Sequence, residues 1–287
     1  VVEYIYEMIA KILSEAKVSY IKWDMNRSIT ECYSVALPAD RQGEVFHRYI
    51  LGVYDLYERL TSEFPEVLFE SCSSGGGRFD PGMLYYAPQG WTSDDSDAIE
   101  RLKIQYGTSL CYPISSMGSH VSVIPNHQVF RKTPLHTRAN VAYFGTFGYE
   151  LDLNSLKEEE IAEVKEQIIF MKKYRKLFQF GDFYRLKSPF EGNETIWMVV
   201  SEDKKTAIVG YYRTLNGVNQ AYSRIKLQGL DPDMLYENIL NKTENYGDEL
   251  MNFGLITTDV TAGEVPGDAT PCTDFESRIY ILKAKEK

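Results

Sequence analysis

Segments with the patterns of strands and helices alternate five times over the first 180 residues, and this alternation limits the fold more than any other feature of the chain. Short apolar runs are typical of buried strands, and apolar residues spaced by three and four positions predict the helices between them. The strands are expected at residues 18–24, 67–71 and 89–93, within 113–123, and at 146–153. Such alternation is typical of a parallel sheet with right-handed crossovers, as in open α/β sheets and (β/α)8 barrels.

The pattern changes after Gly181. Short runs rich in Tyr, Ile and Val are separated by turn-forming clusters such as LNG, NYGD and TAGEVPGD, which predicts a small antiparallel sandwich. The strands are expected at residues 183–186, 195–201, 206–212, 224–227, 235–238, 251–257 and 275–282. We therefore expect two domains, an α/β domain over residues 1–180 and an all-β domain over residues 181–287.

The charge balance excludes some classes of partner. The chain carries 41 acidic and 31 basic residues, a formal net charge of -10, whereas nucleic acids and anionic membranes are bound through basic patches. No run approaches the roughly 20 apolar residues needed to cross a bilayer, and no signal sequence opens the chain. The sequence therefore predicts a soluble protein that acts on a neutral small molecule.

Cysteine and histidine spacing gives no sign of a metal or cofactor site. The four cysteines are far apart and form no CxxC pair, which speaks against a zinc cluster or a disulfide framework and indicates a cytoplasmic protein. The four histidines form no HExxH or paired motif and are interpreted as structural or surface residues. His120 and His127 lie near a predicted strand end, so they are kept as candidates for a substrate contact.

Three successive strands are predicted to end in polar groups. Lys22 and Asp24 end the first, which we interpret as a buried parallel strand; Cys72 and a glycine run from Gly75 follow the second; Asp94 follows the third. In a barrel the carboxyl ends of parallel strands share one rim, so these groups are expected in one cleft. Two carboxylates across a cleft, with no metal motif nearby, suit glycoside hydrolysis.

Each of these residues also has a structural interpretation. Asp24 beside Lys22 and Arg27 suits an ion pair, Cys72 suits a small buried apolar group, and the glycines suit a tight turn. For Asp24 taken by itself the ion pair is the favoured interpretation.

The stretch WTSDDSD offers several carboxylates for one role. At least one of Asp94, Asp95 and Asp97 is expected to cap the following helix, and spacing does not identify the one left free. Trp91 in the same stretch is consistent with an aromatic wall that stacks on the apolar face of a sugar.

Several ordered motifs together resemble a known enzyme family. The stretches are KWDMNRSITE, SCSSGGGRFDPGMLYY, QGWTSDDSDAIERLKIQYGTSLCYP and GSHVSVIPNHQ. They resemble the catalytic region of the α-galactosidases of glycoside hydrolase family 36, and the likeness covers residues 1–180. It implies a (β/α)8 barrel, of which this chain holds about the last five strands, followed by a β-sandwich.

The resemblance also implies roles for single residues. It makes Asp24 the nucleophile and Asp94 the acid/base of a retaining hydrolase that releases terminal α-galactose from melibiose- or raffinose-type oligosaccharides. It implies galactose contacts from Lys22, Asn26, Cys72 and the glycine loop at Gly75. A small-molecule α-galactoside is the expected partner, with no cofactor, no nucleic acid and no membrane, and a homo-oligomer is expected for the full-length protein.

Two departures from the family pattern stand out. The chain opens within a predicted helix just before what resembles barrel strand four, so we expect it to be a piece of a longer protein whose first three barrel units, an acidic pair and a β-sandwich precede it. Cys32 stands where the family pattern suggests Pro. Two alternative functions therefore stay open, an inactive or sugar-binding barrel fragment that needs the missing part, and a transglycosidase that builds raffinose-type sugars.

Overall fold

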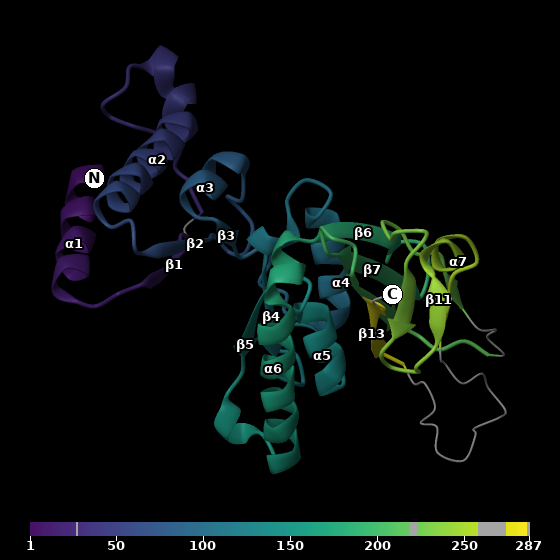
Figure 1. The fold of residues 1–287 in the computed structure, drawn as a ribbon. Helices are drawn as coiled ribbons and strands as arrows, with labels where there is room; N and C mark the ends of the chain where they lie inside the picture. The colour runs from purple at the N-terminus through teal and green to yellow at the C-terminus, as the bar shows by residue number, and fades with distance from the viewer. Residues whose placement is uncertain (27, 219–222, 258–273, 286–287) are drawn as a thin grey trace. The chain divides into compact units, whose positions relative to one another are not determined.

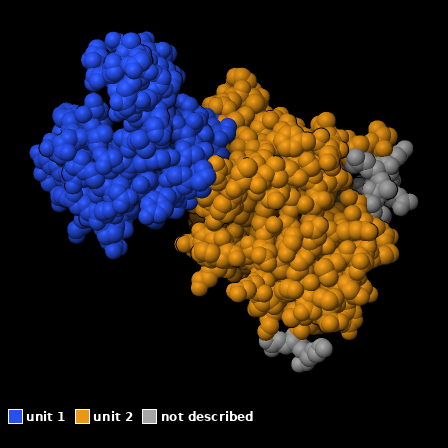
Figure 2. All heavy atoms as spheres, turned by 90° about the horizontal axis from the view of Figure 1, so that it is seen from above, with its two compact units in different colours: residues 1–94 blue, residues 95–287 orange. Residues whose placement is uncertain are grey.

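The structure is a computed structural model that describes residues 1–26, 28–218, 223–257 and 274–285. The chain divides into two compact units, Val1–Asp94 and Asp95–Lys287, which Figure 2 colours blue and orange. Figure 1 labels helices and strands of both units where there is room. Among the described residues no helix is both long and apolar enough to cross a membrane.

Unit 1 consists of helices packed on a three-stranded parallel sheet. Its elements are α1 (Val2–Glu15), β1 (Tyr20–Asp24), α2 (Val45–Glu63), β2 (Leu68–Cys72), α3 (Pro81–Tyr86) and β3 (Gln89–Gly90), with a 3-10 turn at Ala39–Glu44. The strand order is β1-β2-β3, and both pairs are parallel. A helix lies between successive strands, as the crossover of a parallel sheet requires.

Aromatic packing holds one face of this sheet. Trp23 of β1 and Phe69 of β2 both contact Tyr57 of α2, with ring centroids 5.3 and 5.6 Å apart. Full burial of a side chain such as Phe69 contributes about 1.5–3 kcal/mol. Because side chains alternate along a strand, Lys22 and Asp24 lie on the opposite face from Trp23. The helices therefore fix the sheet from one side and leave polar residues on the other.

Unit 2 begins with two more parallel strands. The elements are α4 (Ala98–Thr108), β4 (Gly118–Ser122), α5 (Leu135–Ala142), β5 (Thr146–Glu150) and α6 (Glu158–Phe180), with 3-10 turns at Ile114–Ser116 and Leu153–Ser155. β4 and β5 pair in parallel from Gly118 opposite Thr146 to Ser122 opposite Glu150. The described residues thus contain strands at the five predicted places, parallel within each of two separate sheets, β1-β2-β3 and β4-β5, where the alternation predicts one sheet.

A six-stranded antiparallel sheet follows in the same unit. Its strands are β6 (Asp182–Lys187), β7 (Glu194–Val200), β8 (Thr206–Arg213), β10 (Leu235–Asn238), β11 (Glu244–Tyr246) and β13 (Glu276–Ala284). They lie in the order β11-β10-β13-β8-β7-β6. β9 (Arg224–Ile225) and β12 (Leu255–Ile256) form a separate antiparallel pair, and α7 (Gly247–Asn252) precedes β12.

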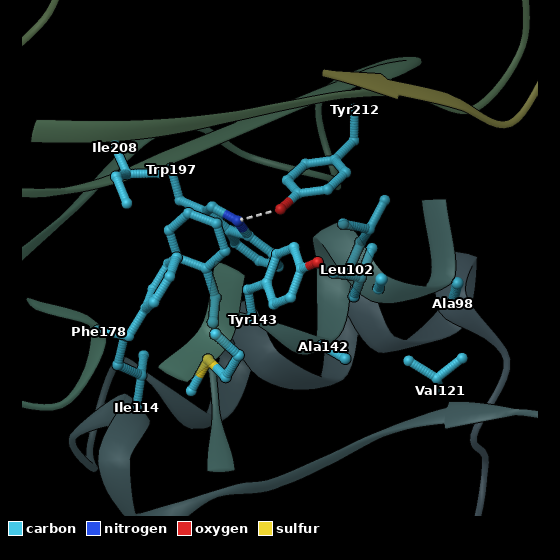
Figure 3. Close-up of a cluster of buried hydrophobic side chains, with 14 of the residues drawn as sticks. Ala98, Leu102, Ile114, Val121, Ala142, Tyr143, Phe178, Trp197, Ile208 and Tyr212 are labelled. Carbon is cyan, nitrogen blue, oxygen red and sulfur yellow. Dashed lines mark hydrogen bonds between the residues drawn. The ribbon is translucent and has the colours of Figure 1, made fainter. Parts of the chain in front are cut away.

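The core of unit 2 joins its helices to the antiparallel sheet. Trp197 of β7 is fully buried, and its indole N–H donates a 2.8 Å hydrogen bond to the hydroxyl of Tyr212 on β8, drawn in Figure 3. The Tyr212 hydroxyl in turn donates to the backbone carbonyl of Asn140 on α5, at 2.7 Å. Phe144 and Phe178 pack into the same cluster. The helices and the sheet of this unit therefore share one hydrophobic core.

The structure corrects the interpretation of the first strand. β1 is not buried: exposed and partly exposed residues alternate along it, and the Tyr20 side chain is 47% exposed. The reason is its position at the sheet edge, where in the described residues it pairs with β2 alone.

The remaining differences concern short elements. β3 ends at Gly90, before the predicted limit of 93, because the chain turns away after the Trp91 N–H donates to the Ser71 carbonyl. The strand predicted at 251–257 is reduced to β12, and α7 begins earlier because Glu249 accepts the N–H of Tyr246 and so caps the helix. Neither α3 nor β11 is predicted. The turn TAGEVPGD lies outside the described residues. The domain boundary expected after residue 180 stays a prediction. It falls within unit 2, and the division of the chain into compact units lies at Asp94 instead.

Candidate active site

The register of the parallel sheet in unit 1 aligns the predicted site residues. Lys22 of β1 pairs with Glu70 of β2, and Asp24 pairs with Cys72. All four side chains lie on the face of the sheet opposite the aromatic core, because each pair is two residues apart on its strand. Asp24 and Cys72 end their strands, so they stand at the carboxyl edge of the sheet, where (β/α)8 barrels and open α/β sheets place chemistry.

Asp24 is exposed and held by an amide. The side-chain nitrogen of Asn26 donates to the Oδ2 atom of Asp24 at 2.8 Å. The side-chain oxygen of Asn26, Oδ1, accepts the backbone N–H of Ser74 at 2.7 Å. Asn26 therefore fixes the carboxylate of Asp24 against the loop that follows β2. The expected partner Arg27 lies outside the described residues.

Cys72 is a neutral thiol beside that carboxylate. Its side chain is buried, and burial raises the pKa of the thiol to about 11, with the Asp24 carboxylate acting in the same direction. A thiol that stays protonated at neutral pH can donate a weak hydrogen bond but is not a nucleophile. The protonated thiol of Cys72 therefore suits a contact to a substrate better than the role of a nucleophile.

The glycine loop after β2 brings the segment of Asp94 close. Gly75 has a φ of +76°, a conformation that favours glycine. A Cβ atom at Gly75 would lie 2.6 Å from the Cα of Ser93 and 2.9 Å from the backbone nitrogen of Asp94. At Gly76 it would lie 2.7 Å from the carbonyl oxygen of Thr92. The glycines therefore allow the loop to pack directly against the backbone that carries Asp94.

Asp94 is connected to the first strand through Trp91 and Lys22. The indole N–H of Trp91 donates to the Oδ1 atom of Asp94 at 3.1 Å, and the Lys22 ammonium lies 4.7 Å from the centroid of the Trp91 ring. Trp91 is only 3% exposed, so it supports these two residues instead of forming the expected open wall for a sugar. Unit 1 thus contains all the residues to which the family resemblance gives a role: Lys22, Asp24, Asn26, Cys72, Gly75 and Asp94.

The helix cap predicted in WTSDDSD is Asp97. Its Oδ2 atom accepts the backbone N–H groups of Ile99 and Glu100, each at 3.1 Å, at the start of α4. Asp97 also forms an ion pair with Arg131. The cap is therefore separate from Asp94, whose carboxylate stays exposed.

Two of the histidines lie beside carboxylates of unit 2. His120 Nδ1 is 3.5 Å from a carboxylate oxygen of Glu150, and His136 Nε2 is 2.9 Å from that of Glu276, all within unit 2. In the described part of the chain no group of three or more His, Cys, Asp or Glu side chains is arranged to hold a metal ion.

Sequence reasoning missed Glu70. This residue is 1% exposed and lies between Lys22 of β1 and Gln89 of β3 on the polar face of the sheet. The signal that could have found it is a charged residue in the middle of the apolar run VLFES, at the position that pairs with Lys22.

Comparison with known proteins identifies the family. A sequence model of the melibiase family matches residues 1–181, and the model of the glycosyl hydrolase family 36 C-terminal domain matches residues 194–282. The chain is 56% identical over 289 aligned positions to α-galactosidase AgaA of Geobacillus stearothermophilus, covering 100% of this chain and 38% of that protein. It is 47% identical to α-galactosidase 1 of Pediococcus pentosaceus, covering 98% of this chain and 37% of that protein.

Solved structures give the same result. An AgaA variant in complex with raffinose superposes with a TM-score of 0.91 at 52% identity, over 99% of this chain and 38% of that chain. The α-galactosidase from Lactobacillus brevis has a TM-score of 0.93 at 50% identity, over 100% of this chain and 38% of that one. This likeness confirms the predicted fold class, part of a barrel followed by a sandwich. The chain spans 38% of the length of AgaA, and it belongs to the melibiase family, with a C-terminal domain of the glycosyl hydrolase family 36 type.

Proposed function

We propose that the protein containing this chain is a retaining α-galactosidase that releases terminal α-galactose from melibiose- or raffinose-type oligosaccharides. The family and the names of its relatives support galactoside hydrolysis. The observation that carries the proposal is the presence of two exposed carboxylates, Asp24 and Asp94, in one unit, with Asp94 bound to Trp91 and the Trp91 ring beside Lys22, which shares a strand face with Asp24.

The proposed reaction has two displacements. A carboxylate oxygen of Asp24 attacks the anomeric carbon while the carboxylic acid of Asp94 gives its proton to the leaving oxygen, so the glycosidic bond breaks and a galactosyl ester of Asp24 forms. The Asp94 carboxylate then takes a proton from a water molecule that attacks the same carbon. The ester bond breaks, galactose leaves in its original α configuration, and both carboxyl groups return to their starting states.

The neighbouring polar groups suit contacts to the sugar. Asn26 donates its side-chain amide to Asp24, and Lys22 lies on the same strand face as Asp24, so both residues can offer hydrogen-bond donors to galactose hydroxyls. The neutral thiol of Cys72 and the close backbone at Gly75 add further contacts in the proposed site.

The decisive experiment follows the stereochemistry of the product. The complete gene product that contains this chain is incubated with an aryl α-galactoside, and the anomers are followed by proton NMR. We expect α-galactose to appear first and β-galactose only through mutarotation. Initial release of the β anomer, or no hydrolysis of any α-galactoside, would rule the proposal out, and transfer to sucrose in excess of hydrolysis would favour the transglycosidase.

The organisation of the whole protein belongs to the same proposal. Residues 1–180 are proposed to form part of the (β/α)8 barrel and residues 181–287 the sandwich domain. A cytoplasmic location is proposed as well, supported by the free cysteines Cys32, Cys72 and Cys111 in the described residues. The whole protein is also proposed to be a homo-oligomer. Light scattering on the purified gene product measures the oligomeric state.

A further inference from the structure

We propose that Glu70 is a positioning residue that fixes the Lys22 ammonium beside Trp91, in the unit that carries the two proposed catalytic carboxylates. The inference rests on the proposed α-galactosidase function, because it concerns the same site. Glu70 touches neither the substrate nor a reacting atom in this account, and it acts through Lys22.

The carboxylate of Glu70 is a meeting point for side chains from all three strands of unit 1. It accepts hydrogen bonds from the hydroxyl of Tyr20 on β1 and, at 2.9 Å, from the side-chain amide of Gln89 on β3. The Lys22 ammonium lies 3.8 Å from its other oxygen. The register explains this meeting, since Lys22 pairs with Glu70 and Glu70 pairs with Gln89.

Burial makes this carboxylate an effective anchor. The side chain of Glu70 is 2% exposed, whereas that of Lys22 is 37% exposed. A charge taken out of water is costly unless it is paired and hydrogen-bonded, and the amide and hydroxyl donors together with Lys22 offset that cost at Glu70. Lys22 carries its charge on a flexible four-carbon stem, so a fixed negative partner at the base of the site restricts where its ammonium lies.

In that position Lys22 lies beside the residue that holds Asp94. From Glu70 the Lys22 ammonium reaches 4.7 Å from the centroid of Trp91, whose indole N–H holds Asp94. Lys22 also shares a strand face with Asp24. Loss of the Glu70 charge therefore frees Lys22 to turn toward solvent and away from both carboxylates.

A double-mutant cycle tests the inference in the complete gene product. We expect Glu70→Gln to lower kcat/KM on an aryl α-galactoside by on the order of 10- to 100-fold, since a small misplacement of a positioned group has effects of this size. If Glu70 acts through Lys22, the same substitution in a Lys22→Met background produces no further loss. Additive losses would show that Glu70 acts independently of Lys22 and would overturn the proposal.

Glu194 on β7 provides a matched control. It too is a poorly exposed carboxylate that accepts from a tyrosine hydroxyl, Tyr211 at 2.7 Å, and pairs with a lysine, Lys187 at 2.5 Å. Glu194→Gln makes the same chemical change in unit 2, and it is expected to lower thermal stability without changing kcat/KM of the folded protein. Equal effects of the two substitutions on kcat/KM would mean that Glu70 is only a structural residue.

A milder variant guards against misfolding of Glu70→Gln. Tyr20→Phe removes one hydrogen bond to Glu70 from a side chain that is 47% exposed, so the protein is expected to fold. It should lower kcat/KM several-fold in the parent and leave it unchanged in the Lys22→Met background; an equal loss in both would contradict the inference. If the unaltered protein hydrolyses no α-galactoside, the proposed function fails; if it does and the cycle is additive, only the role of Glu70 fails.

Discussion

At the scale of single residues, the two proposed catalytic aspartates have different hydrogen-bond donors, an amide for Asp24 and an indole for Asp94. Asp24→Asn is expected to abolish turnover, because an amide is a poor nucleophile toward the anomeric carbon. Asp94→Asn is expected to lower kcat by about 10²- to 10⁴-fold on poor leaving groups, the usual contribution of a general acid. Activated aryl leaving groups should recover part of that loss, since they need no proton. Values of kcat on aryl α-galactosides that span a range of leaving-group pKa check both roles, and an equal loss on every leaving group would contradict the role of Asp94.

The buried thiol of Cys72 makes a second prediction at this scale. Because burial raises its pKa to about 11, Cys72 should react with iodoacetamide at pH 8 on the order of 100-fold more slowly than the exposed Cys111. The pKa of a cysteine thiol in an unfolded chain is about 8.5. The stability that the neutral thiol contributes is therefore present below that pH and is lost as the pH rises toward 11. Mass spectrometry of labelled peptides measures the rates, and equal labelling of both cysteines at pH 8 would show that Cys72 is accessible and ionisable.

At the scale of elements, the loop after β2 controls the position of the loop after β3. Gly75→Ala adds a Cβ at a φ of +76° and 2.6 Å from the Cα of Ser93, so either loop must shift. We expect a loss of about 1–3 kcal/mol in the free energy of unfolding, together with a fall in kcat that thermal stability does not explain. Gly107→Ala in α4 is the control, since its Cβ meets nothing within 4 Å and alanine favours a helix by about 0.5–1 kcal/mol. Denaturant unfolding and kcat are measured for both variants. An unchanged kcat for Gly75→Ala would show that the loop after β2 does not control the position of the loop after β3.

The elements also show which structure is readable from the sequence. Runs such as 67–71 and 206–212 keep their strand pattern because β-branched and aromatic residues are concentrated in them. β11 has the polar sequence ENY and is a strand because it pairs with β10, which is a tertiary interaction that local pattern does not contain. The exposure of β1 has a similar cause. Whether its residues are buried depends on which segment lies beside the edge that does not pair with β2, and local sequence pattern does not contain that information.

Some residues of the candidate site are likewise readable from the sequence, and others are not. Asp24 and Asp94 are suggested by their position after strands, and the resemblance to a family assigns their roles. Glu70 escapes prediction because its importance comes from register, which sets Lys22 and Gln89 beside it on neighbouring strands.

At the scale of the molecule, the core of unit 2 crosses the boundary expected after residue 180. Trp197 lies in the antiparallel sheet, yet its hydrogen-bond chain through Tyr212 ends on α5, within the proposed barrel. Trp197→Ala is therefore expected to cost about 3–5 kcal/mol and to speed amide hydrogen exchange in α5 as well as in β7 and β8. Phe253→Ala, which removes an aromatic ring that is 61% exposed, should leave exchange in all three elements nearly unchanged. Faster exchange confined to β7 and β8 would mean that the sandwich opens alone, so the two proposed domains would be separate folding units despite their shared core.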